Sequence, residues 1–299
     1  MLRGDAQGAG ISRLAIIACD LLFLRPEEVR AVREATGRLT DVPPEHVVIA
    51  CSHTHYGPLT EPSRDEQGPQ VESYLANLVH LLAGVVAMAR ASAVPCRLSF
   101  GQGKVSIGIN RRERTSDGQI ILGQNPSGPV DPRVAVLRID GVDGHPLAAV
   151  LNYACDPVSL GSRCTDISAD FPGTARRVVE EQTGAMCLFL QGAAGNINPL
   201  LMGWDWTQLA RLGLPLGAEA VRIYWSTVPS AEPTNGGVGV ACSQPHLPPL
   251  LPSSIDEGRE TIAMLEMERD RLRVGGAEGA LWWTERRLER AQGIGSPAG

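Results

Sequence analysis

The chain has 299 residues, of which 43% are hydrophobic and 20% are charged, and its net charge at neutral pH is −6. This composition is typical of a folded globular protein and excludes a disordered chain, which would have too little apolar surface to bury. The acidic balance argues against a nucleic-acid-binding protein, because phosphate contacts require clustered cations. No stretch approaches the roughly 20 consecutive apolar residues of a membrane span, so no transmembrane segment is expected.

Short apolar runs bounded by turn residues predict six β-strands. In chain order they are 14–19, 46–51, 97–100, 134–139, 147–153 and 186–191. Helical patterns lie between them at 25–37, 70–91 and 171–183, and the first and third have a proline in their first turn. Helices that alternate with strands indicate an α/β fold, in which a mixed β-sheet core is flanked by helices.

The composition changes after residue 228. Proline- and glycine-rich sequence leads into charged helical segments at 256–273 and 277–291, which predict a helical hairpin. We therefore expect an incomplete catalytic-type α/β domain over residues 1–228, followed by a linker and a helical appendage over residues 229–299. The many Glu and Arg side chains of the hairpin indicate a solvated surface, with partner binding as the alternative.

Seven cysteines are present, and no two of them show C-x-x-C spacing. An odd number without such spacing argues against a disulfide framework and against a cysteine-rich zinc site. Most of these cysteines lie among small apolar residues, where a thiol packs as a small hydrophobic group. The N-terminus lacks the apolar run of a signal peptide, so the default expectation is a cytoplasmic protein.

Two polar segments directly follow predicted strands. His53 and His55 come after the second strand, and an extended backbone would point both imidazoles to one side, where they suit zinc. The alternative is a pair of structural histidines at a strand end. After the fifth strand, Asp156, Asp166 and Asp170 are either metal ligands or turn and helix caps.

A third segment follows the last strand and contains Asn196 and Asn198, together with Gly192 and Gly195, which let the backbone approach a ligand closely. Such a loop suits an oxyanion hole or a phosphate cradle, although the Lys and Ser/Thr of a P-loop are missing. Arg111 is a candidate clamp for a carboxylate or phosphate. Ligands of α/β folds commonly bind at the carboxyl ends of strands, so these placements predict a site there.

In order along the chain, the motifs SHTHYGP, NRR, NYACDPV, SADFPG and QGAAGNINP resemble those of the neutral/alkaline non-lysosomal ceramidase family, most closely its short bacterial branch. The resemblance spans residues 14–201. It implies a zinc-dependent amidase of sphingolipid metabolism that cleaves the N-acyl bond of ceramide with metal-activated water. The implied substrate is a lipid amide, and a small soluble amide is equally open.

The resemblance also implies roles for individual residues. His53 matches a zinc ligand, and Asp156 stands where the family has its second ligand, a histidine. His55 matches a catalytic histidine beside the metal that handles the reacting amide. Arg111 matches an arginine of the substrate site, and residues 196–199 match the loop that faces the scissile bond. We take Asn196 of this loop as substrate-binding and Asn198 as catalytic.

The sequence departs from the family pattern at several positions. Ceramidases carry a serine where Asn198 stands, and Tyr56 replaces a small serine. The third and fourth zinc ligands of the family, a glutamate and a tyrosine, belong to a later segment that has no counterpart here. We therefore expect a chain that lacks the C-terminal part of the family. With only His53 and Asp156 as ligands, zinc would be weakly held unless His55 joins them.

These observations leave three alternatives. The first is a zinc-dependent hydrolase that cleaves an amide bond. The second is a truncated or degenerate, non-catalytic family member with an incomplete metal site, for which exposed apolar surface is expected. The third is a thiol hydrolase that uses Cys51 or Cys155 with a nearby histidine. The oligomeric state is open.

Overall fold

The computed structural model describes residues 2–6, 9–61, 68–228, 240–243, 254–275, 284–285, 287–288 and 291–292. The chain forms two compact units, Met1–Cys242 and Ser243–Gly299. The division after residue 228 that the composition indicates stays a prediction, since the residues that follow it, 229–239, lie outside the described part.

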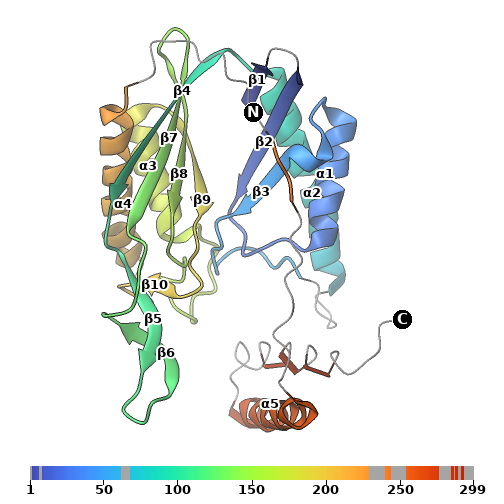
Figure 1. Ribbon diagram of the computed structural model, residues 1–299, viewed down its shortest axis with the longest axis vertical. Coiled ribbons are helices and arrows are strands. Elements are labelled where there is room, and N and C mark those ends of the chain that lie inside the picture. The colour runs from blue at the N-terminus through green and yellow to red at the C-terminus, as the bar shows by residue number, and fades with distance from the viewer. Residues whose placement is uncertain are drawn as a thin grey trace. The chain divides into compact units, whose positions relative to one another are not determined.

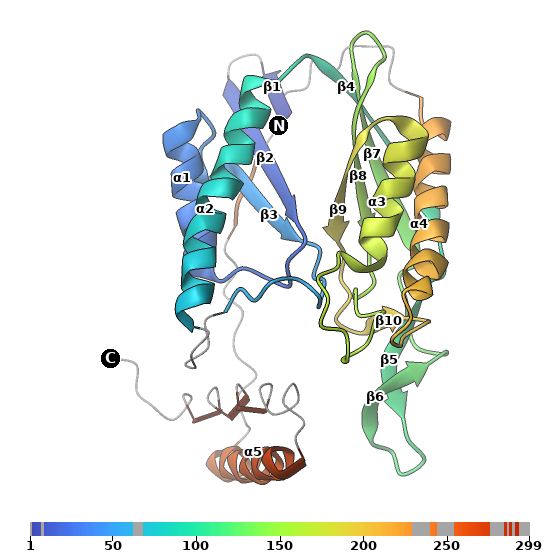
Figure 2. The ribbon, with the colours of Figure 1, turned by 180° about the vertical axis from the view of Figure 1, so that it is seen from behind.

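Two sheets lie side by side in the first unit, with a pair of helices on the outer flank of each (Figures 1 and 2). The first sheet has the strand order β1-β2-β3, in which β1 is antiparallel and β3 parallel to β2. Its elements are β1 (Leu2–Ala6), β2 (Ala9–Cys19), β3 (Val47–Cys51), α1 (Pro26–Leu39), the short 3-10 helix Pro44–His46 and α2 (Gly68–Ala91). Ala15, Ile17 and Val47 of the sheet share a buried core with residues of α1 and α2.

The second sheet has the strand order β4-β7-β8-β9, and only β8 and β9 are parallel. Its elements are β4 (Cys96–Lys104), β7 (Arg133–Gly141), β8 (Pro146–Tyr153), β9 (Met186–Gln191), α3 (Asp170–Thr183) and α4 (Thr207–Ser226). One face packs on α3 and α4 around Tyr153, Phe171 and Phe189. The opposite face is apolar as well, and with Leu14 and Ile16 of β2 it lines a cavity of about 570 Å³ between the sheets.

Helix α4 is not among the helices that the sequence predicts. Pro215 and two glycines interrupt its pattern, and both glycines face α3. A Cβ atom on Gly213 would lie 2.7 Å from the carbonyl oxygen of Phe171, and one on Gly217 would lie 2.9 Å from that of Ala175. The glycines are therefore needed for the close approach of the two helix backbones.

A third, small sheet has the order β10-β5-β6. Its strands are β5 (Gly108–Arg114), β6 (Ile120–Asn125) and β10 (Ile197–Pro199), none of which the apolar runs predict. In its register Asn110 is paired with Ile197 and Ile109 with Asn198. This pairing brings Arg111 to the loop that precedes β10, where its backbone N–H donates to the carbonyl of Asn196 at 2.8 Å.

The mixed α/β architecture confirms the predicted fold class, and each of the six predicted strands is found. In the second unit the structure has α5 (Ile255–Gly275). The second segment of the expected hairpin, 277–291, lies mostly outside the described residues.

Helix α2 corrects one expectation. Among the described residues it is the one helix that is long and apolar enough to cross a membrane, with 24 residues and a mean hydropathy of 1.5 in its most apolar window. The statement that no stretch approaches a span was therefore wrong. Only 28% of that window is buried. Val71, Leu75, Leu78 and Leu82 lie in the core that α2 shares with α1 and β2, while Leu81, Val85 and Met88 are exposed.

Candidate metal centre

The site lies where β3, β8 and β9 of the first unit end (Figure 1). His53 and His55 follow β3, Asp156 follows β8, and the loop with Gly192 and Gly195 follows β9. β3 is parallel to β2 and β9 is parallel to β8, and the arrowheads of β3, β8 and β9 point to the same end of the unit (Figure 1). Ligands of such folds commonly bind at the carboxyl ends of strands.

His53 is held by three backbone interactions. The N–H of Ser52 donates to Cys19 O at 2.8 Å, and the N–H of His53 donates to Leu21 O at 3.0 Å. The ring nitrogen Nδ1 lies 2.8 Å from Leu22 O. Since a carbonyl oxygen only accepts, Nδ1 carries the proton, and Nε2 of the neutral ring is left as a free lone pair. A backbone carbonyl that fixes the tautomer in this way is typical of metal-binding histidines.

The predicted geometry of this segment was partly wrong. His53 has a φ of 67°, in the left-handed region, so the backbone is not extended after β3. Histidine is among the residues that tolerate this region best, and the cost is about 1–3 kcal/mol. The two imidazoles are nevertheless close, with ring centroids 5.4 Å apart and planes at 88°. A turn at His53 therefore brings the rings together where alternation along a strand was expected to do so.

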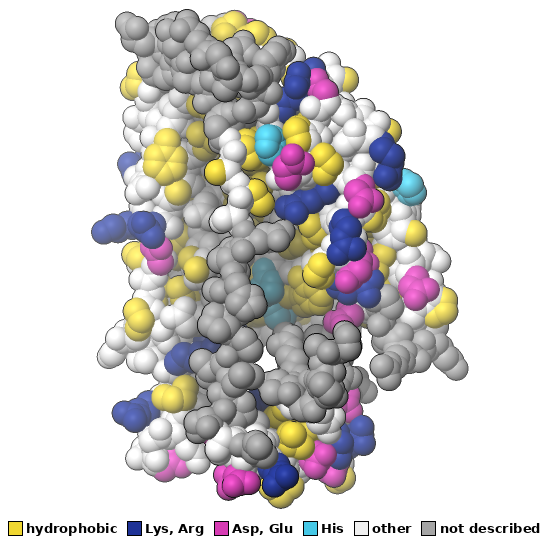
Figure 3. Space-filling model, turned by 45° about the vertical axis from the view of Figure 1, so that its right-hand side comes forward, with side chains coloured by type: hydrophobic (Ala, Val, Ile, Leu, Met, Phe, Trp, Pro, Cys, Tyr) yellow, Lys and Arg dark blue, Asp and Glu magenta, His cyan; other side chains and the backbone are white. Residues whose placement is uncertain are grey.

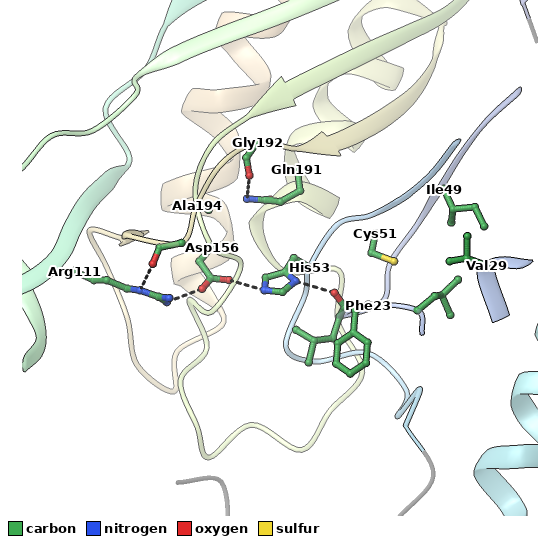
Figure 4. A pocket seen from close by; sticks show the side chains of 13 residues that line it. Phe23, Val29, Ile49, Cys51, His53, Arg111, Asp156, Gln191, Gly192 and Ala194 are labelled. Atoms are coloured by element: carbon green, nitrogen blue, oxygen red, sulfur yellow. Dashed lines mark hydrogen bonds and ion pairs between the residues drawn. The ribbon is translucent and has the colours of Figure 1, made fainter. Parts of the chain in front are cut away.

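Asp156 lies opposite the ring of His53 (Figure 4) and close to that of His55. Its Oδ1 is 3.5 Å from Nε2 of His55 and 4.0 Å from Nε2 of His53, and its side chain is only 5% exposed. Arg111 occupies the other oxygen, with Nη1 donating to Oδ2 at 2.9 Å. Oδ1 is buried and accepts no hydrogen bond. A buried oxygen without a donor is costly, which indicates that a cation or a proton belongs at this point.

The donor set fits zinc. Catalytic zinc sites use three protein ligands, commonly two histidines and a carboxylate, and leave one position open. With metal–ligand bonds of about 2.0–2.1 Å, tetrahedral ligand atoms lie roughly 3.3 Å from one another. The ligand atoms of His53, His55 and Asp156 all lie within 4.8 Å of one another, so these side chains would draw closer together around an ion.

Several contacts join the segments that carry these side chains. The Thr54 hydroxyl donates to Ser168 O at 2.7 Å, and the N–H of His55 donates to Pro157 O at 3.3 Å. The N–H of Asp156 donates to Ile197 O at 3.0 Å. The site is thus built on backbone contacts between loops that are remote in sequence.

Asp170 stabilises the turn that follows Asp156. Its carboxylate accepts hydrogen bonds from the backbone N–H and the hydroxyl of Ser159 at 2.9 and 2.6 Å, and from the N–H of Phe171. Burial raises the pKa of this carboxyl, against the opposing effect of those donors. Asp170 is therefore a buried anchor of the turn after Asp156, whereas Asp166 is exposed.

The remaining predicted site residues are Arg111, Asn196 and Asn198, of which only Arg111 contacts one of the three donors directly. Arg111 donates through Nη1 to Asn198 Oδ1 at 3.1 Å and through Nε to Gly195 O at 3.1 Å. Asn198 is buried on β10, and its Nδ2 contacts Met202 Sδ at 3.7 Å. Asn196 is half-buried, and its Nδ2 lies 3.5 Å from Pro129 O. The structure joins Asn198 to Asp156 through Arg111, and the substrate roles of Asn196 and Asn198 stay predictions.

A cavity of about 380 Å³ opens onto the centre. His53, Arg111 and Asp156 form one wall together with Gln191 and the glycine loop, and the opposite wall is apolar. The apolar wall consists of Leu22, Phe23, Leu24, Val29, Ile49 and Cys51. Figure 3 shows a recessed histidine side chain in a hollow beside apolar side chains. Sequence reasoning missed this wall, although the apolar run that continues past Asp20 was a signal for it.

The thiols were candidates for a different chemistry. Cys155 is fully buried, and burial raises its pKa well above the ordinary range, so it is neither accessible nor readily ionised. This does not favour a nucleophilic role for Cys155. Cys51 does line the cavity, beside His53 (Figure 4).

No known protein-family signature matches the sequence, and no curated protein is similar to it. Among solved structures, ceramidases are similar in fold. A neutral ceramidase from Pseudomonas aeruginosa superposes with a TM-score of 0.57 and 21% identity, over 74% of this chain and 38% of its own. A structure of ceramidase complexed with C2 gives a TM-score of 0.56 and 23% identity, over 72% of this chain and 36% of its own. The resemblance that the motifs indicate is thereby confirmed at the level of the fold, over little more than a third of the ceramidase chains.

Proposed function

We propose that this chain is a zinc-dependent hydrolase of the neutral ceramidase type, which cleaves an N-acyl amide. The observation that carries the proposal is the buried Asp156 Oδ1, which accepts no hydrogen bond and faces the Nε2 atoms of His53 and His55 in a fold similar to that of neutral ceramidase. The apolar wall of the cavity further supports a substrate that has an apolar part next to its amide.

His53 and Asp156 would hold the ion, and His55 is within reach of the same point. Bound zinc lowers the pKa of water toward neutrality and polarises an amide carbonyl. Arg111 keeps the Asp156 carboxylate oriented, since it fixes Oδ2 and leaves Oδ1 toward the histidines. The side chain of His55 is 36% exposed, so it is also placed to pass a proton to the leaving amine.

The proposal is tested by the zinc content of the purified chain, measured by elemental analysis. About one zinc ion per chain is expected, and His53→Ala should lose it. Asp166→Asn is the control and should retain the zinc, because it removes an exposed carboxylate from the segment that follows Asp156. Hydrolysis of N-acyl amides should then stop on chelation, return with zinc and persist in Cys51→Ala, which removes the thiol without adding a group to the cavity. Zinc bound in the parent and in His53→Ala alike would contradict the assigned site.

His55→Ala separates the two roles of His55. If His55 is a ligand, the variant loses zinc; if it transfers a proton, the variant keeps zinc and loses hydrolysis. Retention of both zinc and full activity would remove His55 from the site.

A second candidate is a non-catalytic member of the same fold with an incomplete metal site. One observation favours it: within the described residues the cluster has three donors, and one of them, Asp156, is already paired with Arg111. This candidate predicts no zinc in the parent and recovery of zinc in Asp156→His. Absence of zinc from both proteins would contradict the metal centre altogether.

A further inference from the structure

Two cysteines meet in the wall of the cavity. Cys19 is the last residue of β2 and Cys51 the last of β3, and the two are direct partners in the parallel ladder. Their Sγ atoms are 3.8 Å apart. Among the residues that the structure describes, which include all seven cysteines, this is the one sulfur–sulfur contact.

The backbone geometry permits a disulfide at this position. Register partners on neighbouring strands have side chains on the same face, and the strands run about 4.8 Å apart. Disulfides join Cα atoms that are about 4.4–6.8 Å apart, so the strands need not separate or shift. Rotation of the two side chains has to bring the sulfur atoms from 3.8 Å to a bond length of about 2.05 Å. Both residues end their strands, where such an adjustment disturbs the ladder least.

The pair is also accessible. Cys51 lines the cavity of about 380 Å³, and both thiols are only partly buried. Each of the other five cysteines lacks one of these properties: Cys155 and Cys187 are buried, and Cys96, Cys164 and Cys242 are partly or fully exposed but have no neighbouring sulfur. Access and a neighbouring sulfur occur together only at Cys19 and Cys51.

We propose that Cys19 and Cys51 are a redox-active dithiol that closes to a disulfide in the cavity wall, with a low-molecular-weight disulfide such as oxidised glutathione as the oxidant. The Cys51 thiolate attacks one glutathione sulfur and expels the first glutathione thiolate, which takes up a proton. Cys19 then attacks Sγ of Cys51 and expels the second glutathione. The two thiols lose two protons and two electrons, and one glutathione disulfide becomes two glutathione thiols.

The disulfide would sit at the base of the segment that positions His53. Cys19 O accepts from the N–H of Ser52, and the carbonyls of Leu21 and Leu22 hold the backbone and ring of His53. Oxidation would therefore lock the ends of β2 and β3 and remove the thiol from the apolar wall. The proposal does not depend on the hydrolase function, because dithiol chemistry needs no metal and no substrate.

The experiment treats the native, reduced full chain with oxidised glutathione, alkylates the free thiols, and maps the cysteines by mass spectrometry without reduction. Trypsin releases Cys19 in residues 14–30 and Cys51 in residues 39–64, with one cysteine in each peptide. The two peptides are expected to be joined by a disulfide. Cys96 serves as the control and should take up at most a glutathione adduct.

Cys19→Ser supplies the second test, because it removes the resolving thiol. In this variant Cys51 should accumulate as a stable mixed disulfide with glutathione, and Cys19→Ala should behave alike if the serine hydroxyl disturbs packing. Two outcomes would overturn the proposal: both cysteines of the parent recovered as alkylated thiols, or Cys51 glutathionylated in the parent as stably as in Cys19→Ser. Zinc content measured on the reduced chain reports on the hydrolase proposal separately.

Discussion

Arg111 binds one oxygen of Asp156 at 2.9 Å and thereby leaves the other oxygen facing two histidines. The guanidinium also donates to Asn198 and Gly195, so it connects the small third sheet to the centre. A carboxylate that is 5% exposed depends on such a partner, because an uncompensated charge at this depth is destabilising.

Arg111→Met should therefore lower the free energy of unfolding by about 2–3 kcal/mol, since it leaves the buried Asp156 charge unpaired. Zinc should restore part of this loss, because a cation at Oδ1 compensates the same carboxylate. Thermal unfolding with and without zinc measures both effects. Arg112→Met is the matched control, because the side chain of Arg112 donates one hydrogen bond, of 3.3 Å, to Gly195 O. It should change stability by less than about 0.5 kcal/mol. Equal losses in both variants would contradict the assigned partnership.

Gly213→Ala should destabilise the protein by about 1–3 kcal/mol, because the new methyl group would lie 2.7 Å from the Phe171 carbonyl and push α4 from α3. Gly84→Ala in α2 should do the opposite. A Cβ there meets nothing within 4 Å, so the gain in helix propensity of about 0.5–1 kcal/mol remains. Urea denaturation of both variants checks the opposite signs, and a destabilised Gly84→Ala would contradict the packing described for α2.

Tyr224→Phe should cost about 1 kcal/mol at neutral pH, because the Tyr224 hydroxyl donates to buried Asp140 Oδ1 at 3.0 Å. Burial, and then Asp140, raise the pKa of Tyr224 to about 12, against about 10 for an unfolded tyrosine. The raised pKa means that this stabilisation is complete below about pH 10 and is lost as the pH rises through about 12.

The difference in unfolding free energy between the parent and Tyr224→Phe should accordingly shrink above pH 10, as denaturation at two alkaline pH values would measure. A difference that grows with pH would have the wrong sign for a tyrosine whose neutral form is favoured in the folded state.

Thr54→Val should weaken the metal centre without touching a donor. Thr54 stands between His53 and His55 in the sequence and is buried, and its hydroxyl donates to Ser168 O. Valine has nearly the same shape but cannot donate this hydrogen bond. We expect a loss of about 1 kcal/mol in stability and weaker zinc binding, with Thr54→Ser restoring both. Zinc titration monitored by calorimetry is the measurement, and an unchanged affinity in Thr54→Val would exclude this positioning role.

The regular elements of the two main sheets could be predicted because their apolar runs are continuous and bounded by turn residues. The run 186–191 coincides with β9, whose neighbours are a helix end and a glycine loop. Helix α4 could not be predicted, because a proline and glycines are typical of loops and it contains Pro215, Gly213 and Gly217. The role of the glycines follows only from the close packing of α4 on α3. Strand β5 is mostly polar, and the apolar stretch of β6 is only three residues long, Ile120 to Leu122, and exposed, so neither has the longer apolar run of a buried strand.

The site divides in the same way. That His53, His55 and Asp156 would share a strand-end site followed from their positions after predicted strands. The turn at His53 could not be read from the sequence, because it depends on the carbonyls of Leu21 and Leu22 as partners. The pairing of Arg111 with Asp156 depends on the β10–β5 register, which local patterns do not contain.

The histidines come from the sheet that contains β3, and the aspartate comes from the sheet that contains β8. An ion held by all three would therefore join the two main sheets of this unit. Its binding would also stabilise the packing of the two sheets against each other. By mass action, each tenfold rise in the free ion concentration above its dissociation constant would stabilise the packed arrangement of the two sheets by about 1.4 kcal/mol. If the proposed centre binds an ion, removal of the metal should therefore make the two sheets separate more readily.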